Sequence, residues 1–509
     1  MVCRWVGECM SRSKGGTFPP IDEAERPEIA PGRNGPDWLP KRREFFRILG
    51  AGAGLALLRP ATASTAVNVD DTTERLRSRL LNDKVFWTEI EGMFTLNPAR
   101  IFMNVGTGGS MPREVLEAFD AENRALARDP RSQYSDFLEQ RKKIAPGFGV
   151  DTDELVMSYN TTAGLCSAIL GIPWSKGDVI VTTNHEHRGG NSPLAIAAHR
   201  YDVEISRVAL PVGNNQNASD YFALFNDHIR RLKARGKRVR AMMWSSPTFT
   251  TGTMLPIEQL MDVAKAHGLI SIVDGAHLPG MMAYDYANLG MDFMSGSGHK
   301  WQCGPGSSGI FVVRNKVRPS NPNPPSEFWP ILSDRFPPSK PSGSQWNQRA
   351  IGPMATYDVA SVLQPVGGMN VPQFKALAKS CEIWDRIGRK KIEVYVVTLG
   401  LYLKEKIAER WGADRLYSPK DDPKLLTALT SFNPFVDARD ITDPVKSDQF
   451  VNRMLSDYSP GFVVKNVATP VIGSASDHRV VRISTHLWND ATDIDRLVDA
   501  MWNLSTKMT

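Results

Sequence analysis

A carboxylate and a lysine lie 26 positions apart in the middle of the chain, and each has a distinctive setting. Asp274 follows the apolar run 269–273, which predicts a buried parallel strand that ends at the carboxylate. Lys300 ends the run Ser295-Gly-Ser-Gly-His-Lys, whose small residues predict a tight turn that brings the backbone close to a ligand. This stretch therefore predicts a parallel sheet that presents an acid and an amine to one ligand.

Pyridoxal 5'-phosphate is a cofactor that suits such a pair. It needs a lysine that holds it as a Schiff base and an acid that keeps its pyridine nitrogen protonated. Each residue alone has an ordinary explanation, because most loop lysines are solvated and most strand-end aspartates are caps or loop anchors. Their joint order along the chain favours the cofactor, and further segments support it.

The segment 155–164 is an apolar run that ends in Asn160-Thr-Thr-Ala-Gly, and a helix is expected from Leu165. Hydroxyls and free backbone N–H groups at the start of a helix form an anion site, which fits the phosphate of the cofactor. Capping of the helix by Thr161 or Thr162 is the commoner use of such residues. Both explanations stay open from the residues alone.

A third segment, Asn184-His-Glu-His-Arg, follows the predicted strand 179–183. A metal site formed by His185, Glu186 and His187 is not expected. Neighbours in an extended chain point to opposite faces, and no Cys or His follows at ligand spacing.

These segments, taken in order, resemble the class V aminotransferase family of fold-type I pyridoxal-phosphate enzymes, and its isopenicillin N epimerase-like branch in particular. The resemblance runs from about Phe102 to Leu504. It begins with an arm that carries Asn104, Gly106, Gly109 and Pro112. It ends with a strand, Val480-Val-Arg-Ile-Ser-Thr-His-Leu-Trp-Asn, that carries an arginine.

The resemblance implies a role for each matched residue. Lys300 binds the cofactor, Asp274 protonates its ring nitrogen, and His187 stacks on its ring. His277 contacts the phenolic oxygen of the cofactor. The residues expected to hold the phosphate are Thr161, Thr162, Ala163, Ser297 and His299, with Ser344 reaching it from the partner subunit of a homodimer.

The resemblance also implies a substrate side. Arg482 inherits the task of holding a substrate carboxylate, for which a rigid bidentate fork is suited. Asn104, in the glycine-bearing arm, belongs to the same side, and Ser246 and Thr248 are weaker candidates. The implied chemistry is transamination or epimerisation at the α-carbon of an amino-acid-like substrate, through a Lys300 Schiff base.

Two alternatives stand beside this function. A desulfurase of the family uses a mobile cysteine shortly before the substrate-binding arginine, and residues 459–481 contain none, although a lyase that forms no persulfide stays open. The other alternative is an exported binding protein on a retired enzyme fold, because a fold alone never proves catalysis.

The start of the chain carries a separate signal. Lys41-Arg42-Arg43-Glu44-Phe45-Phe46-Arg47 precedes the short apolar run 48–58 and then Ala61-Thr62-Ala63. Paired arginines, a short apolar region and a small-x-small site predict a twin-arginine export signal and a periplasmic or secreted protein. Eleven apolar residues are too few for a comfortable membrane span.

Composition and organisation agree with an exported enzyme. Net charge is +6, with 61 basic and 55 acidic residues, so neither nucleic acid nor a membrane surface is an expected partner. Three of the five cysteines follow the leader, widely spaced, and predict no disulfide framework. We expect a doubly wound, mostly parallel α/β domain with a smaller α/β C-terminal domain. The predicted divisions are 1–63 for the disordered leader and signal, 64–115 for an N-terminal arm, 116–365 for the large domain and 366–509 for the small domain.

Overall fold

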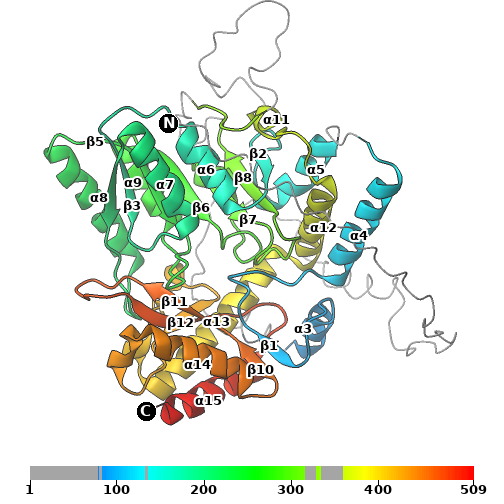
Figure 1. The fold of residues 1–509 in the computed structure, drawn as a ribbon, viewed down its shortest axis with the longest axis vertical. Coiled ribbons are helices and arrows are strands. Elements are labelled where there is room, and N and C mark those ends of the chain that lie inside the picture. The colour runs from blue at the N-terminus through cyan, green and yellow to red at the C-terminus, as the bar shows by residue number, and fades with distance from the viewer. Residues whose placement is uncertain (1–77, 79–82, 132–135, 316–327, 334–358, 509) are drawn as a thin grey trace, which may run out of the picture. The chain divides into compact units, whose positions relative to one another are not determined.

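A seven-stranded sheet, ordered β2-β8-β7-β6-β5-β3-β4, forms the centre of the computed structural model (Figure 1). In chain order its strands are β2 (Leu155–Ser158), β3 (Asp178–Thr183), β4 (Glu204–Val208), β5 (Arg238–Ser245), β6 (Ile270–Gly275), β7 (Phe293–Ser297) and β8 (Gly309–Val313). β8 pairs antiparallel with both of its neighbours, and the other four pairings are parallel. The mostly parallel sheet predicted from the sequence is confirmed.

The structure describes residues 78, 83–131, 136–315, 328–333 and 359–508. The predicted export signal and Ser344 lie outside these residues. None of the described helices is both long enough and apolar enough to cross a membrane.

Helices cover both faces of the sheet, because successive strand residues point to opposite sides. In β3, Ile180 packs with α6 (Thr161–Gly171), α7 (Arg188–Tyr201) and α11 (Val359–Leu363). Its neighbours Val179 and Val181 pack on the other face. The helices of that second face are α5 (Asp136–Ile144), α8 (Ala218–Ala234), α9 (Ile257–His267), α10 (Tyr286–Leu289) and part of α12 (Val371–Ile387).

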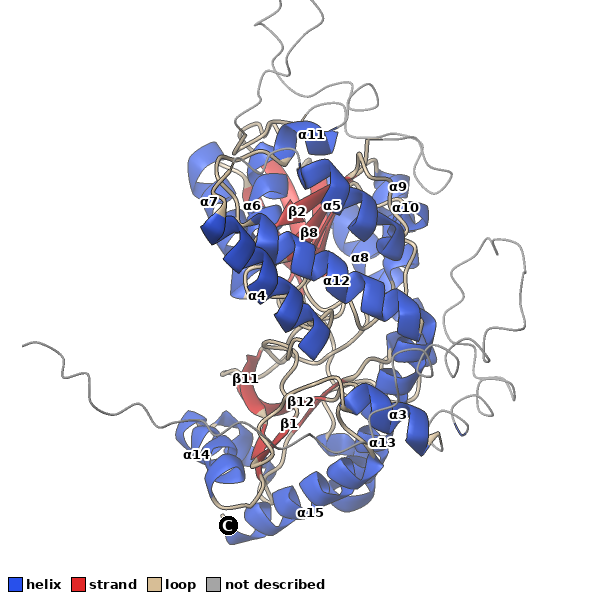
Figure 2. Cartoon of the chain, turned by 90° about the vertical axis from the view of Figure 1, so that its right-hand side faces the viewer, coloured by secondary structure: helices blue, strands red, loops and turns tan. Residues whose placement is uncertain are grey.

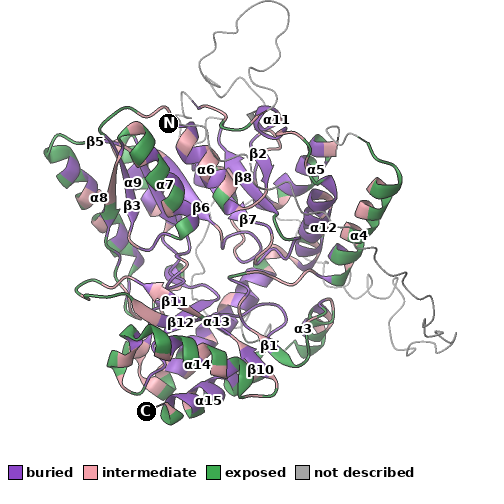
Figure 3. Cartoon of the chain, viewed as in Figure 1, coloured by how far each residue is buried: buried purple, intermediate pink, exposed green. Residues whose placement is uncertain are grey.

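Figure 2 shows α6 and α7 on one side of the strands and α8, α9 and α10 on the other. In Figure 3 the strands β6, β7 and β8 are buried, whereas α8 exposes its outer surface. Runs such as Ile272-Val273 are apolar at every position because both faces of this sheet are covered. The doubly wound arrangement predicted from the sequence therefore holds for the described residues.

A second lobe contains a three-stranded antiparallel sheet in the order β11-β12-β9. Its strands are β9 (Leu429–Phe432), β11 (Lys465–Thr469) and β12 (His478–Ser484). The helices around it are α13 (Arg389–Trp411), α14 (Pro444–Ser456) and α15 (Ala491–Lys507). Short 3-10 turns occur at Ala145–Phe148, Ala413–Arg415, Pro423–Leu425 and Ala438–Thr442.

The segment before the large sheet packs into this second lobe. β1 (Arg100–Phe102) pairs in parallel with β10 (Gly461–Val463). Trp87 of α3 (Lys84–Glu91) stacks on Tyr395 of α13 with ring centroids 3.8 Å apart. The next helix, α4 (Arg113–Arg128), packs against α12 instead. The chain therefore contributes to the second lobe twice, before and after it builds the large sheet.

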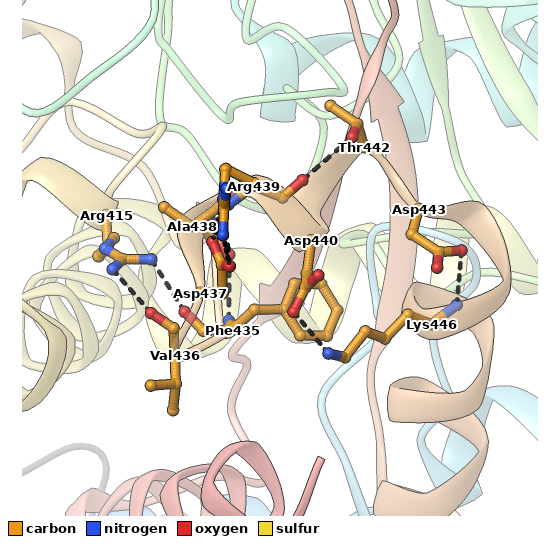
Figure 4. Close-up of polar contacts among 11 residues, drawn as sticks. Arg415, Phe435, Val436, Asp437, Ala438, Arg439, Asp440, Thr442, Asp443 and Lys446 are labelled. Atoms are coloured by element: carbon orange, nitrogen blue, oxygen red, sulfur yellow. Dashed lines mark hydrogen bonds and ion pairs between the residues drawn. The ribbon is translucent and has the colours of Figure 1, made fainter. Parts of the chain in front are cut away.

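The approach to α14 shows how local polar contacts fix a helix start (Figure 4). Asp443 is the N-cap of α14 and accepts from the backbone N–H groups of Val445 and Lys446 at 2.8 and 3.1 Å. The Lys446 ammonium turns back to pair with Asp440. Thr442 donates to the carbonyl oxygen of Arg439 at 3.0 Å, which closes the preceding turn.

Three local expectations need correction. The run from Ser295 is not wholly a turn, since residues 293–297 form β7 and the turn begins at Gly298. α6 begins at Thr161 rather than Leu165, and its cap is Asn160 rather than a threonine. The helical periodicity of residues 374–411 predicts a break or bend around both Gly388 and Gly400, but the structure has a break at Gly388, where φ is 100°, and α13 continues through Gly400.

Candidate active site

A cavity of about 410 Å³ lies where the two lobes contribute side chains to one space. The large sheet supplies the ends of β6 and β7 and the starts of α6 and α7. The second lobe supplies Lys465 of β11 and Arg482 of β12. Nine of the residues predicted from the sequence line this cavity: Thr161, Thr162, His187, Asp274, His277, Ser297, His299, Lys300 and Arg482.

Asp274 and Lys300 meet because β6 and β7 are parallel neighbours. Asp274 is paired in register with Ser295, and Lys300 follows β7 in the next turn. Burial raises the pKa of Asp274, whereas the Ala276 N–H, which donates to its Oδ1 at 3.0 Å, and the charge of Lys300 lower it. Burial lowers the pKa of Lys300 to about 8, with Arg482 and Lys465 adding to the effect and Asp274 opposing it.

The glycine-bearing arm holds the Lys300 turn in place. Gly109 donates its N–H to the carbonyl oxygen of His299 at 2.8 Å. A Cβ atom at Gly109 would lie 2.1 Å from the carbonyl oxygen of Lys300, so only glycine permits this approach. The arm predicted from the sequence therefore acts on the lysine through its backbone.

The hydroxyl side of the cavity is built at the start of α6. The Thr161 and Ser297 hydroxyls hydrogen-bond to each other at 2.7 Å, which ties α6 to β7. Asn160 caps the helix by accepting the N–H of Ala163 at 2.9 Å, so Ala163 is already bonded and does not line the cavity. A Cβ atom at Gly189 would lie 2.5 Å from the hydroxyl of Thr162. Because Gly189 has no side chain, the Thr162 hydroxyl has room at this position.

Neighbouring groups fix the tautomers of two histidines. The Trp301 indole N–H donates to Nδ1 of His277 at 3.0 Å, which leaves Nε2 as the protonated nitrogen of His277. Burial, Lys300 and Arg482 keep the pKa of His277 well below its usual range. His299 places Nδ1 3.1 Å from the carbonyl oxygen of Ser308, so Nδ1 is the protonated nitrogen there.

His187 begins α7 and lines the cavity beside an aromatic ring. Its Nδ1 accepts the N–H of Gly189 at 3.0 Å, which makes it the N-cap of the helix. Its ring meets Phe249 edge to face, with centroids 4.9 Å apart. Burial lowers the pKa of His187 to about 4, with the charges of Lys300, Lys465 and Arg482 acting in the same direction. The imidazole is therefore neutral at physiological pH.

Arg482 is buried without an acidic partner among the described residues. Its Nη1 donates to the carbonyl oxygen of Phe249 at 2.9 Å, and its Nε and Nη2 have no hydrogen-bond partner in the part of the chain that the structure describes. Burial lowers its pKa to about 10, so the guanidinium stays charged at neutral pH. A buried cation with two unsatisfied nitrogens on a cavity wall fits an anionic ligand.

Some predicted residues lie elsewhere. Asn104 does not line the cavity, and its Oδ1 accepts the hydroxyl of Thr107 at 3.0 Å instead. Ser246 and Thr248 are buried away from it, in hydrogen bonds with Leu255 and Thr251.

Sequence reasoning also missed residues that do line the cavity, among them Thr107, Phe249, Ser307 and Lys465. Phe249 follows the strand β5 that the sequence did predict, so its place at the end of a parallel strand could have been predicted. Lys465 carried no local signal.

The residues present fit pyridoxal phosphate. An amine with a lowered pKa and a buried acid face one cavity, and hydroxyls at a helix start line the same space. Among the described residues no group of three His, Cys, Asp or Glu side chains could hold a metal ion.

Residues 111–497 match the family model described as Aminotransferase class-V. The chain belongs to this family. Three curated relatives illustrate the range of class V. Isopenicillin N epimerase of Streptomyces clavuligerus is 25% identical over 82% of this chain and 97% of its own length. A probable cysteine desulfurase of Pyrococcus abyssi is 24% identical over 77% of this chain and 91% of its length. Hercynylcysteine sulfoxide lyase of Schizosaccharomyces pombe is 22% identical over 67% of this chain and 82% of its own length.

Solved structures of the family share the fold. The apo cysteine desulfurase of Thermococcus onnurineus aligns with a TM-score of 0.64 at 21% identity, over 82% of this chain and 98% of that one. The cystine C-S lyase C-DES, in complex with cysteine persulfide, aligns with a TM-score of 0.63 at 21% identity, over 80% of this chain and 98% of that one. A variant of C-DES carries glycine linked covalently to its pyridoxal-phosphate cofactor. This class V chain is thus a fold-type I, pyridoxal-phosphate-dependent enzyme.

Proposed function

We propose that this enzyme acts at the α-carbon of an amino-acid-type substrate, by epimerisation or transamination. The observation that carries the proposal is the pairing, in one cavity, of Lys300 with Arg482. Lys300 is an amine whose pKa is lowered to about 8, and Arg482 is a buried guanidinium with two unsatisfied nitrogens. Isopenicillin N epimerase, one of the relatives, supports the same class of reaction.

Arg482 would bind the substrate carboxylate and orient the substrate. Its Nε and Nη2 are free to form a bidentate pair, while Nη1 stays anchored to the carbonyl oxygen of Phe249. Because this anchor fixes the guanidinium in advance, little ordering entropy is lost when the carboxylate binds.

Pyridoxal phosphate, when bound, supplies an electron sink that stabilises negative charge at the substrate's α-carbon. Asp274 would keep the ring nitrogen protonated, and Thr161, Thr162, Ser297 and His299 would hold the phosphate. Lys300 would take the proton from the α-carbon, because an amine with a pKa near 8 is partly neutral at physiological pH. Returning that proton to the opposite face of the α-carbon would give epimerisation. Returning it to the cofactor, followed by hydrolysis that releases a keto acid and leaves the amino group on the cofactor, would give transamination.

The test is a visible absorbance spectrum of the purified protein, loaded with pyridoxal phosphate, beside Lys300→Ala. We expect a visible band in the wild type that the variant lacks, and that particular amino acids shift. Incubation in deuterated water then separates the outcomes. Deuterium at the α-carbon with scrambled stereochemistry indicates epimerisation, and a keto acid indicates transamination. A protein that stays colourless after loading would reject the enzyme and leave a binding protein on the same fold.

A second candidate function is a C–S lyase. Hercynylcysteine sulfoxide lyase and C-DES support it as relative and structural neighbour. Desulfuration through an enzyme persulfide is less favoured, because none of the described cysteines lines the cavity. Burial raises the pKa of Cys303 well above its usual range, so this thiol stays protonated. Release of pyruvate from cystine or cysteine sulfoxides would establish the lyase and reject the α-carbon reaction as the main activity.

Export and dimerisation are also proposals. We propose that Arg42 and Arg43 direct twin-arginine export, and that the active enzyme is a homodimer with Ser344 contributed across the interface. Replacing both arginines by lysine should keep the protein inside a host that has the export pathway. Fractionation with an enzymatic marker measures this. Light scattering on the purified protein measures the dimer, and a monomer with full activity would reject it.

A further inference from the structure

The candidate active site carries a third basic side chain, which the proposed chemistry does not use. Lys465 lines the cavity together with Arg482 and Lys300, and the one acidic residue among the lining residues is Asp274. We propose that Lys465 binds a second carboxylate of the substrate. The substrate would then be an α-amino acid that carries an additional acidic group. This inference rests on the proposed action at an amino acid.

The strand register places the two cations side by side. β11 and β12 are antiparallel, and Lys465 lies directly opposite Arg482 in the ladder. Residues directly opposite on neighbouring strands point to the same face of a sheet, with Cβ atoms roughly 5 Å apart. Both side chains therefore project from the second lobe into the cavity.

Two like charges in this position repel each other unless an anion joins them. Burial lowers the pKa of Lys465, and the charge of Arg482 lowers it further. Neither residue forms an ion pair with a described carboxylate. Among the described residues, the Lys465 ammonium contacts the hydroxyl of Thr107 at 3.4 Å, and no carboxylate there compensates its charge. An arrangement that costs energy when empty is explained by a ligand that supplies two negative groups.

The cofactor phosphate is a weaker explanation for this charge. The hydroxyls suited to the phosphate come from α6 and β7 of the large sheet. Lys465 instead stands with Arg482 and Thr107, and Gly106 approaches the same guanidinium, since a Cβ atom there would lie 3.0 Å from Nη2 of Arg482. Lys465 is also partly exposed, so its ammonium lies on the open side of the cavity, where the far end of a substrate would enter.

The experiment compares matched amino acids by titration of the visible band in the loaded protein. The pairs are glutamate with glutamine and aspartate with asparagine, which differ by one charge at nearly equal shape. We expect the acidic member of one pair to bind about tenfold more tightly, as a charge-assisted hydrogen bond at a partly exposed site allows. Lys465→Met should remove this preference by weakening the acid alone, and Lys465→Arg should keep it. Lys424→Met, an exposed lysine outside the cavity, is the control for net charge.

Calorimetry with glutarate and butyrate repeats the comparison without an amine. If Lys465 favours glutarate although no amino acid shifts the band, the inference stands and the proposed function falls. If amino acids react but the wild type prefers neither acids nor glutarate, the inference falls and the proposed function stands. Unchanged binding in Lys465→Met with loss of proton exchange would also overturn it, because Lys465 would then be an acid–base group. Weaker binding of pyridoxal phosphate itself by this variant would assign Lys465 to the phosphate.

Discussion

Two of the buried arginines lie in opposite electrostatic settings. Arg314, just after β8, pairs with the carboxylate of Asp292, which also accepts the backbone N–H and hydroxyl of Ser271, both at 2.8 Å. Arg482 is equally buried, but among the described residues its hydrogen-bond partner is one carbonyl oxygen. A carboxylate compensates the charge of Arg314, whereas no described carboxylate compensates that of Arg482. Burial alone therefore does not separate these two arginines, and the presence of a carboxylate partner does.

The largest expected effect comes from breaking the compensated pair. Asp292→Asn leaves Arg314 buried without its carboxylate, which should lower the free energy of unfolding by about 3–5 kcal/mol. Urea denaturation followed by fluorescence measures the change. Asp499→Asn is the control, because Asp499 is the exposed partner of Arg410 and its loss should leave the urea midpoint unchanged. Equal midpoints for both variants would mean that the Arg314 pair does not stabilise the fold.

Removing the uncompensated arginine should affect binding instead of folding. Arg482→Met loses a bidentate carboxylate contact, so we expect amino-acid affinity to fall about 100-fold, or roughly 3 kcal/mol. The urea midpoint should stay constant or rise, because an unpaired buried charge is removed. Arg482→Lys keeps the charge but not the fork, and should restore only part of the affinity. A drop in stability as large as that of Asp292→Asn would contradict the comparison.

The same contrast explains how far the sequence could go. Asp274, His187 and Thr161 were predictable because each follows an apolar strand, and the ends of parallel strands meet at one edge of the sheet. Arg482 was named through the family resemblance. The structure adds that two of its nitrogens have no hydrogen-bond partner among the described residues and could bind an anion. Local pattern and chain order predicted the sheet, and the family resemblance was needed to name about half of the residues that line the cavity.

Other features depended on contacts between distant segments. Lys465 matters through its register with Arg482, which no local pattern encodes. β7 was partly mistaken for a turn because it contains glycine and serine. Helix α6 packs so closely there that a Cβ atom at Gly164 would lie 2.2 Å from the hydroxyl of Ser295. The small residues of this buried strand therefore indicate close packing against α6 and not a turn.

Lys404 of α13 is another buried cation, and it extends the comparison of compensated and uncompensated charges to a lysine. Its ammonium donates to the carbonyl oxygen of Thr427 at 2.9 Å, it pairs with no described carboxylate, and it does not line the active-site cavity. Burial lowers its pKa from 10.5 to about 7. The unfolded chain therefore binds more protons between pH 7 and 10.5, and the contribution of Lys404 to stability should rise with pH across that window.

Lys404→Met should remove this dependence. We expect the variant to be more stable than the wild type by about 2 kcal/mol at pH 7, with the gain shrinking as the pH rises toward 10.5. Thermal unfolding in a series of buffers measures the difference. Lys406→Met, which removes a partly exposed lysine that pairs with Glu409 on the same helix, is the control. A gain that does not vary with pH would mean that the pKa of Lys404 is the same in the folded and the unfolded protein.

The smallest expected effect concerns a hydrogen bond between two uncharged side chains at the cavity, those of Trp301 and His277. Trp301 donates its indole N–H to Nδ1 of His277 and thereby fixes the proton of that histidine on Nε2. Trp301→Phe removes the donor, so His277 can take either tautomer, and we expect proton exchange at the α-carbon to slow tenfold or less. The pH at which the visible band titrates should move as well. Trp384→Phe is a matched control, because Trp384 is equally buried but donates to the carbonyl oxygen of Gly280. If both variants lose stability and neither moves the titration, Trp301 only fills space; a shift in Trp301→Phe alone identifies it as the residue that positions His277.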